Sequence, residues 1–344
     1  MASCPRSKIV RKHKMGVYHC WNRCVRRAFL CGRDPLTETD YSHRRDWLLE
    51  RQEQLAGLMA IEIGCQAILA NHFHVLLRTR PDVARRWGRE EVARRWLTLT
   101  RLAKAADSGV PEPDERKVVA LGKDKKRIEK LRKRLSSVSW LMGVLCENIA
   151  RRANGEDDCK GRFFETRFRS RACTDESAIL ACAIYIDLNQ IRAGEAATPE
   201  TSRFTSAYQR IRSRGQRGKT LDGWLCALTL KEGAREDRTG HTTSRSGRRA
   251  SDKGLLPISL DDYLKLLDWT GRQFRRDTRG AIPSHLAPIL DRLAIRPEYW
   301  LELIEHLDEW YCHAVGRPQG MTDMAEQMDA CWLKGMPASR RAMG

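Results

Sequence analysis

Residues 61–77, with the sequence IEIGCQAILANHFHVLL, constrain the fold more than any other part of this 344-residue chain. The segment is rich in β-branched and apolar residues, and Ala70 and Asn71 near its middle can form a turn. This pattern predicts two paired core strands. The preceding residues 41–60 carry Trp47, Leu48 and Leu55 at helical spacing among charged residues, which predicts a surface helix. The two predictions together indicate an α+β domain.

Other segments extend this picture. A strand is expected at 17–24, where alternation places Tyr18 and Cys20 on one face. Apolar residues at helical spacing predict helices at 140–154 and 177–192, the second between a Thr-Asp-Glu start at 174–176 and a stop at Gly194. Amphipathic helices are expected at 258–267 and 299–311.

Composition divides the chain into three regions. Residues 1–209 hold the α+β domain, with a charged, irregular insertion at about 81–135. Residues 210–254 are expected to be a flexible basic linker, because 210–253 contain 12 Lys or Arg against 5 acidic residues and few apolar ones. Residues 255–344 are expected to form a small, all-helical C-terminal domain.

Charge indicates the kind of partner. Lysine and arginine number 63 against 44 acidic residues, a net charge of +19, which favours a polyanion. No stretch approaches the roughly 20 apolar residues of a membrane span, and the first residues lack the apolar core of a signal peptide. We therefore expect a soluble cytoplasmic protein with no membrane partner.

The first chemical motif is His72-Phe73-His74. Residues two apart on a strand point to the same face, so both imidazoles project together while Phe73 packs on the other side. Two imidazoles on one face make half of a metal site. The pair alone is a weak signal, and a structural role explains it equally well.

The helix at 177–192 offers further groups. Tyr185 and Asn189 are four residues apart, which places a phenol and an amide oxygen side by side on one helix face. Each alone has an ordinary structural explanation, since such a tyrosine is usually packed in the core and an asparagine near a helix end is usually a cap. Their value lies in the combination.

Two other clusters leave alternatives open. Residues 161–171, GRFFETRFRSR, interleave arginine with phenylalanine, which suits phosphate binding and base stacking, or equally a half-buried strand whose arginines face water. His19, Cys20, Cys24 and Cys31 lie close in sequence, but their spacing fits no familiar zinc pattern. Small side chains packed on a strand and its turn explain them more simply.

Four blocks give the chain a resemblance to a known family: YHCWNRCVRRAFL at 18–30, AILANHFHVLL at 67–77, GRFFETRFRS at 161–170 and YIDLNQIRAG at 185–194. In this order and spacing they resemble the single-tyrosine HUH transposases of bacterial insertion sequences, and more closely the REP-associated tyrosine transposases. The resemblance covers residues 10–210. Ala70 and Gln190 stand where a proline is common in that family.

The resemblance implies a ferredoxin-like antiparallel sheet with helices on one side. It implies that Tyr185 is the catalytic nucleophile and that His72, His74 and Asn189 are ligands of Mg²⁺ or Mn²⁺. The arginines expected to bind DNA are Arg23, Arg26, Arg27, Arg162, Arg167, Arg169 and Arg171.

The implied activity is that of a DNA transposase, a metal-dependent endonuclease and strand transferase. It would act on single-stranded or hairpin DNA through a 5′-phosphotyrosine, at the nucleoid. A homodimer that exchanges tyrosines and a monomer both remain open. The alternative is a domesticated, catalytically inactive protein that only binds nucleic acid.

Overall fold

The computed structural model describes residues 5–344, except 12, 36, 104–111, 215–223, 230–252 and 275–282. Most of the predicted linker at 210–254 therefore lies outside the described residues. The helices that it does describe are α1 (Arg6–Ile9), η1 (Val25–Arg27), α2 (His43–Leu58), α3 (Pro81–Arg86), α4 (Arg89–Leu102), α5 (Glu115–Lys123), α6 (Lys125–Leu135), α7 (Val138–Glu156), α8 (Glu176–Asp187), α9 (Asn189–Arg192), α10 (Ser206–Arg214), α11 (Leu260–Gln273), α12 (Ala287–Arg292), η2 (Pro297–Tyr299), α13 (Trp300–Glu305), α14 (Leu307–Trp310), α15 (Pro318–Gln327) and α16 (Met336–Ala342).

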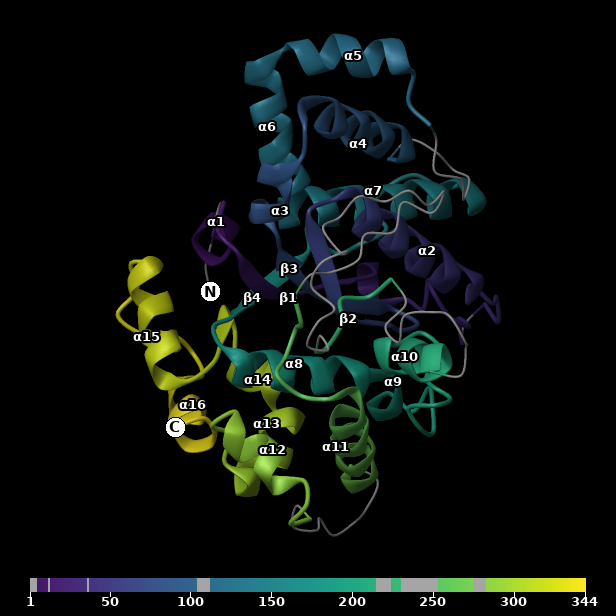
Figure 1. Ribbon diagram of the computed structural model, residues 1–344. Coiled ribbons are helices and arrows are strands. Elements are labelled where there is room, and N and C mark those ends of the chain that lie inside the picture. The colour runs from purple at the N-terminus through teal and green to yellow at the C-terminus, as the bar shows by residue number, and fades with distance from the viewer. Residues whose placement is uncertain are drawn as a thin grey trace.

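A five-stranded sheet lies at the centre of the molecule (Figure 1). Its strands are β1 (Gly16–Arg23), β2 (Ile61–Ile68), β3 (His72–Thr79), β4 (Arg169–Cys173) and β5 (Ala314–Val315), in the spatial order β2-β3-β1-β4-β5. The first four pair antiparallel, whereas β5 pairs parallel with β4. The α+β class is confirmed, but the sheet is mixed rather than purely antiparallel.

The hairpin of β2 and β3 matches the two strands predicted from residues 61–77. The chain turns after Ile68, and the Leu69 amide donates to the His72 carbonyl across the turn at 2.9 Å. Every residue of β2 is buried, as expected for a β-branched strand covered on both faces. The register places His74 opposite Trp21 of β1, so the histidine pair lies on a central strand.

Helices cover both faces of the sheet, so the prediction of helices on one side only is wrong. Figure 1 shows α2 and α7 on one face and α8 on the other. Helix α8 is apolar around its whole circumference, and residues 177–187 are all buried. A helix of this kind must be covered on every side. The sheet covers one side of it and the C-terminal helices cover the other.

The charged insertion at 81–135 is helical over its described residues. Helix α4 packs against α5 and α6. Asp114 and Asp124 cap α5 and α6 by accepting hydrogen bonds from the backbone amides of Arg116 and Arg127, both at 2.9 Å. The prediction of an irregular insertion is therefore wrong for these residues. Each helix has few apolar residues, and these are buried against the neighbouring helices, so the segment alone carries little helical signal.

The C-terminal region packs directly on the first 209 residues. The amide of Ala172 in β4 donates to the His313 carbonyl at 2.9 Å, and β5 extends the sheet. The hydroxyl of Tyr263, on α11, donates to the Asp187 carboxylate of α8 at 2.6 Å. The region is largely helical, as predicted, but it also contributes a strand to the central sheet. The predicted boundaries at 209 and 254 stay a prediction, which truncation can test.

Candidate active site

His72 and His74 project from the same face of β3, as their alternation predicts. Their ring centroids lie 5.1 Å apart, and His74 is 3% exposed. Phe73 points to the opposite face, where its ring meets the edge of Phe164 at 5.9 Å. The strand therefore presents two imidazoles to the layer that holds α8.

Hydrogen bonds orient both imidazoles through their Nδ1 atoms. The Nδ1 of His72 lies 2.6 Å from Asn71 Oδ1, and the Nδ1 of His74 lies 2.9 Å from His19 Nε2. This leaves Nε2 of each ring as the atom that can bind a metal, an arrangement typical of metal-ligating histidines. Burial, and then the charge of Arg23, lower the pKa of His72 to about 4.

Burial also lowers the pKa of His74, with smaller contributions from the nearby His19 and His72. Both rings are thus neutral at neutral pH. Neutral imidazole is the form that binds metals.

Tyr185 lies on α8 and faces the histidines. Its ring centroid is 5.8 Å from that of His74 and 6.0 Å from that of His19. The helix starts at Asp175, whose side chain accepts a hydrogen bond from the Ala178 amide, so the phenol is held on a capped, fully packed element. Tyr185 is 5% exposed.

A carboxylate from the C-terminal region meets the phenol. The Tyr185 hydroxyl donates a hydrogen bond to Asp308, on α14. Arg171, on β4, holds the other carboxylate oxygen of Asp308 at 2.5 Å and donates to the Leu307 carbonyl at 3.0 Å. The guanidinium of Arg171 also lies over the Trp21 ring, at 4.6 Å from its centroid.

This contact has opposite effects on the two acids. Burial raises the pKa of Tyr185, and the Asp308 carboxylate raises it further. Burial alone would raise the pKa of Asp308, but the charge of Arg171 and the smaller contributions of the other groups around the carboxylate together outweigh it, and the pKa falls below its usual range. The pair is therefore a neutral phenol bound to an ionised carboxylate.

Asn189 lies one turn after Tyr185, beyond a break in the helix at Leu188. Its amide nitrogen donates to the Tyr185 carbonyl at 2.9 Å, so Oδ1 remains as the acceptor atom of the side chain. The asparagine thus has the local capping role that such a residue usually plays. The same bond fixes the amide beside the tyrosine.

The donor set suits a divalent cation. By type, two imidazole nitrogens and one amide oxygen match the mixed ligands of first-row metals, with water able to complete the shell. In the described structure the Asn189 side chain contacts the Tyr185 carbonyl rather than either histidine. Among the residues that the structure describes, no three His, Cys, Asp or Glu side chains are arranged to hold a metal. The candidate set therefore depends on Asn189.

The same finding argues against a zinc site at His19, Cys20, Cys24 and Cys31. His19 contacts His74 and Tyr185, on the α8 face of the sheet. Cys20 is its neighbour on β1 and points to the opposite face. The three cysteines are buried, with at most 2% exposure, as small core side chains.

The arginines expected to bind DNA divide into two groups. Arg26, Arg162, Arg167 and Arg169 are exposed and Arg23 is half-buried, while the Arg27 side chain lies outside the described part of the structure. Arg171 is 1% exposed and bound to Asp308. In this structure it is an internal ion-pair partner rather than a surface for DNA.

Sequence reasoning missed two members of this site. The sequence groups His19 only with nearby cysteines, although its place two residues before Trp21 on β1 puts it on the histidine face. Asp308 lies in an ordinary amphipathic segment, 123 residues after Tyr185. No local pattern marks it.

No protein-family model matches the chain, and no curated protein matches it. Among solved structures it is similar to one described as the REP-associated tyrosine transposase bound to a REP hairpin. The identity is 13%, the match covers 67% of this chain and 96% of that one, and the TM-score is 0.31. A similarity this low does not establish a shared function, so a functional conclusion has to come from the site itself.

Proposed function

We propose that this protein is a metal-dependent transposase that cuts and rejoins single-stranded DNA through Tyr185. One observation carries the proposal: the Tyr185 ring lies 5.8 Å from the ring of His74, the second histidine of a pair that shares one face of β3. The phenol and the two imidazoles are more than 100 residues apart in sequence. A nucleophile beside two neutral metal ligands is the arrangement that phosphoryl transfer needs.

His72, His74 and Asn189 would hold Mg²⁺ or Mn²⁺. A bound ion would polarise the scissile phosphate and help to orient it. Tyr185 attacks the phosphorus, a bond forms between Oη and phosphorus, and the bond from phosphorus to the 3′ oxygen breaks. The phenol gives up one proton and the departing oxygen takes one, which leaves a 5′-phosphotyrosine and a free 3′-hydroxyl. That hydroxyl can reverse the step on another strand end.

Asp308 and Arg171 determine how the nucleophile is reached. The Asp308 carboxylate accepts the hydrogen bond of the Tyr185 hydroxyl. The scissile phosphate, which is also an anion, has to come close to that same hydroxyl oxygen. The substrate therefore has to displace Asp308 from the phenol. Arg171, released from that carboxylate, is then a cation beside the reacting phosphate.

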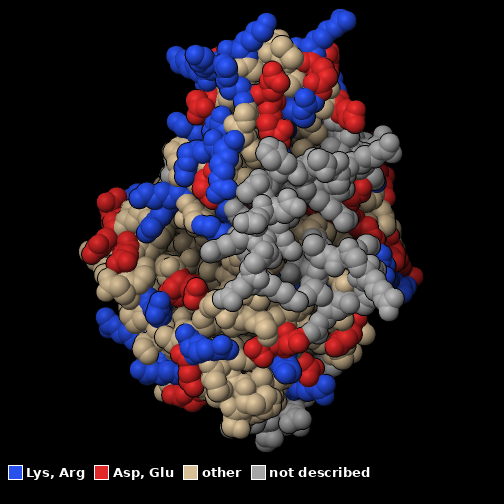
Figure 2. All heavy atoms as spheres, in the orientation of Figure 1, with Lys and Arg blue, Asp and Glu red and all other residues tan. Residues whose placement is uncertain are grey.

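Charge supports DNA as the partner. The net charge of +19 exceeds what solubility requires. In Figure 2, Lys and Arg side chains gather over the part of the molecule where Figure 1 places α5 and α6. Helix α6 has the sequence KKRIEKLRKRL, with seven basic residues and one acid. Such a surface binds a phosphate backbone without reading its sequence.

The strand order supports the fold expected for such an enzyme. The order β2-β3-β1-β4, with α2 between β1 and β2 and α7 between β3 and β4, supports a ferredoxin-like core extended by β5. Single-stranded or hairpin DNA at the nucleoid is the expected substrate, with a homodimer as one possible assembly. No helix among the described residues is long and apolar enough to cross a membrane.

One observation favours the second candidate function, a protein that binds nucleic acid without cutting it. Asp308 raises the pKa of the Tyr185 phenol and occupies its hydroxyl, which opposes attack. A domesticated protein could keep such a contact. It would keep its DNA affinity and give no cleavage with any divalent metal.

The test is a cleavage assay with single-stranded DNA from both flanks of the encoding gene, in Mn²⁺ and in Mg²⁺. The proposal predicts metal-dependent nicks with free 3′-hydroxyl ends. Tyr185→Phe should bind the same DNA with unchanged affinity and give no nicks, because it removes one oxygen and keeps the ring. Nicking by this variant at the wild-type rate would contradict the assignment.

A further inference from the structure

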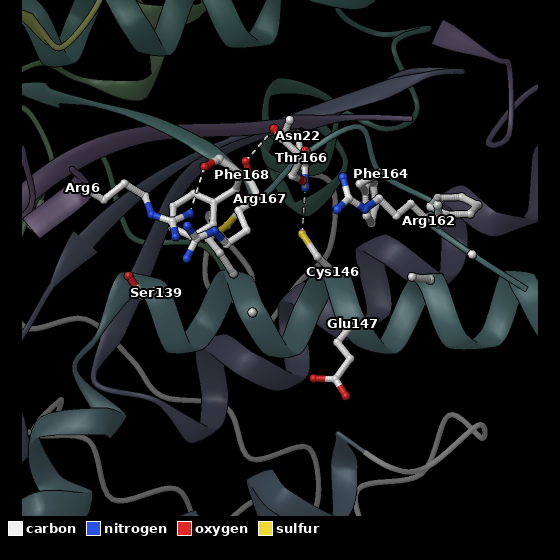
Figure 3. Close-up of a pocket in the computed structure, with 15 residues that line it drawn as sticks. Arg6, Asn22, Ser139, Cys146, Glu147, Arg162, Phe164, Thr166, Arg167 and Phe168 are labelled. Carbon is white, nitrogen blue, oxygen red and sulfur yellow. Dashed lines mark hydrogen bonds between the residues drawn. The ribbon is translucent and has the colours of Figure 1, made fainter. Parts of the chain in front are cut away.

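A cleft lies on the face of the sheet opposite Tyr185, between α7 and the segment 161–168 (Figure 3). Its volume is about 590 Å³, within the range of roughly 300–1,000 Å³ usual for pockets that hold small molecules. Asn22 of β1 lines it, whereas the neighbouring Trp21 faces the histidines. The cleft and the candidate active site therefore lie on opposite sides of one strand.

The walls of the cleft are apolar and partly aromatic. Phe163, Phe164 and Phe168 line it from one side, and Met142, Cys146 and Ala150 of α7 line it from the other. The Phe163 and Phe164 rings meet at 81°, with centroids 4.9 Å apart. Each phenylalanine is at most 8% exposed, so these rings form a fixed wall rather than a mobile surface. The volume of the cleft leaves room for a flat ring system between this wall and α7.

Three arginines surround the slot. Arg6 lies over the Phe168 ring, at 4.3 Å from its centroid, and donates to the Phe168 carbonyl at 3.1 Å. Arg162 and Arg167 are exposed and line the same cleft (Figure 3). Burial, and then the nearby charge of Arg167, lower the pKa of Arg6.

The cations have no counterion in the described part of the chain. None of the three guanidiniums contacts a carboxylate there. The one carboxylate at the edge of the cleft, Glu147, is bound to Arg151 at 2.5 Å. An anionic ligand would therefore complete the site.

The cleft also offers a group that can bind a base edge. Asn22 is 4% exposed. Its amide nitrogen makes two contacts, both long, at 3.4 Å to Cys146 Sγ and at 3.4 Å to the Thr166 carbonyl. Its Oδ1 accepts from the Arg23 amide at 3.0 Å, which fixes the orientation of the group. A base edge would bind this donor by replacing one of the two 3.4 Å contacts.

We propose that this cleft binds an unpaired nucleotide of the DNA strand, with its base in the aromatic slot and its phosphates on Arg6, Arg162 and Arg167. The inference rests on the proposed function, because it names where the substrate of Tyr185 is held. Aromatic walls and arginines together are how proteins hold single strands. Arg23, which is half-buried, and Arg26, which is exposed, lie at the end of β1, the strand whose two faces carry the cleft and the candidate active site.

Two glycines of α7 provide the test. A Cβ added at Gly143 or at Gly155 would meet no atom within 4 Å, so both positions accept a larger side chain, but only Gly143 lines the cleft. Gly143→Leu should fill the slot, and Gly155→Leu is the matched control. The measurement is fluorescence anisotropy of full-length protein with a labelled single strand from the flank of the gene.

We expect Gly143→Leu to weaken binding about 10-fold, the size of losing one stacked base, while Gly155→Leu stays near wild type. Arg162→Gln with Arg167→Gln should make the slope of log binding constant against log salt concentration shallower, by roughly 0.7 for each lost phosphate contact. Arg85→Gln with Arg89→Gln, two exposed arginines outside the cleft, controls for net charge. Equal affinity of the two leucine variants would overturn the proposal.

Further arms separate the related outcomes. A free nucleoside monophosphate, added at the same total phosphate concentration as the labelled strand, should not displace that strand. Displacement would overturn the assignment of the cleft to a DNA strand. Equally tight, Gly143→Leu-sensitive binding of an RNA of the same sequence would also overturn it. Gly143→Leu should still form the Tyr185 adduct at saturating DNA. If wild-type protein forms no adduct but Gly143→Leu still weakens binding, the proposed catalysis fails and the cleft stands.

Discussion

The hydroxyl of Tyr185 donates a hydrogen bond to the carboxylate of Asp308, a residue of the C-terminal region that also pairs with Arg171. This contact joins the candidate nucleophile to a part of the chain outside the four motif blocks. It makes α14 a wall of the candidate active site. The surroundings of the Tyr185 hydroxyl therefore include α14 as well as the histidine strand.

Replacing Asp308 tests this dependence. Asp308→Asn keeps the shape of the side chain and removes a negative charge that raises the pKa of Tyr185. The pKa of the phenol should fall, so a larger fraction is ionised at a given pH and adduct formation should reach half its maximum at a lower pH. A pH series of adduct yield measures this shift.

The contrary outcome for Asp308→Asn is loss of the adduct at every pH, in a variant that unfolds at the wild-type temperature. That result would mean that Asp308 takes the phenol proton. Folding has to be checked in the same sample, because Asp308→Asn leaves the buried Arg171 guanidinium without its carboxylate partner.

Metal dependence should follow the histidine pair. His72→Ala with His74→Ala, or removal of divalent ions with EDTA, should abolish nicking with little change in DNA affinity, because the exposed arginines lie elsewhere. Isothermal titration with Mn²⁺ should lose its binding signal in the double variant. Full activity of that variant in metal-free buffer would rule out the site.

Sequence reasoning predicted the parts of the site that have a local signature. The alternation of His72, Phe73 and His74 was enough to assign their faces, and a helix with Tyr185 followed from its apolar run. His19 and Asp308 could not be assigned in this way. Each enters the site through a contact with a residue 55 or more positions away, and such contacts follow from the whole sheet and its packing.

Truncation should show how far the C-terminal region supports the core. Sequence analysis expects residues 1–209 to carry the chemistry as one domain. The structure predicts that removing 255–344 uncovers part of α8, whose apolar side chains are all buried and which packs against α13 as well as against the sheet. Exposing several such side chains costs about 1.5–3 kcal/mol each, against a total stability of about 5–15 kcal/mol.

The truncated chain should therefore lose its cooperative thermal transition, measured by circular dichroism. A truncated protein that unfolds cooperatively near the wild-type temperature would show that residues 1–254 fold without the C-terminal region. Forming the adduct as well would show that Asp308 is dispensable.

Removing a single hydroxyl tests the contact between α8 and the C-terminal region without deleting any segment. Tyr263 of α11 donates to Asp187 of α8, and both side chains are completely buried. Tyr263→Phe leaves the carboxylate with one hydrogen bond fewer and should cost about 1–3 kcal/mol in free energy of unfolding. Tyr208→Phe, whose hydroxyl receives only a 3.4 Å contact from Arg212, is the control and should change little. Urea denaturation of both variants decides the comparison.

The most direct test of the central claim is to locate a covalent bond between protein and DNA. Wild-type protein is incubated with flanking single-stranded DNA and Mn²⁺, denatured and digested, and the peptide that carries the nucleotide is sequenced by mass spectrometry. The account predicts a phosphotyrosine linkage at Tyr185 that disappears with EDTA. A linkage at Tyr18 or Tyr208, or none in any metal while the DNA remains bound, would contradict it.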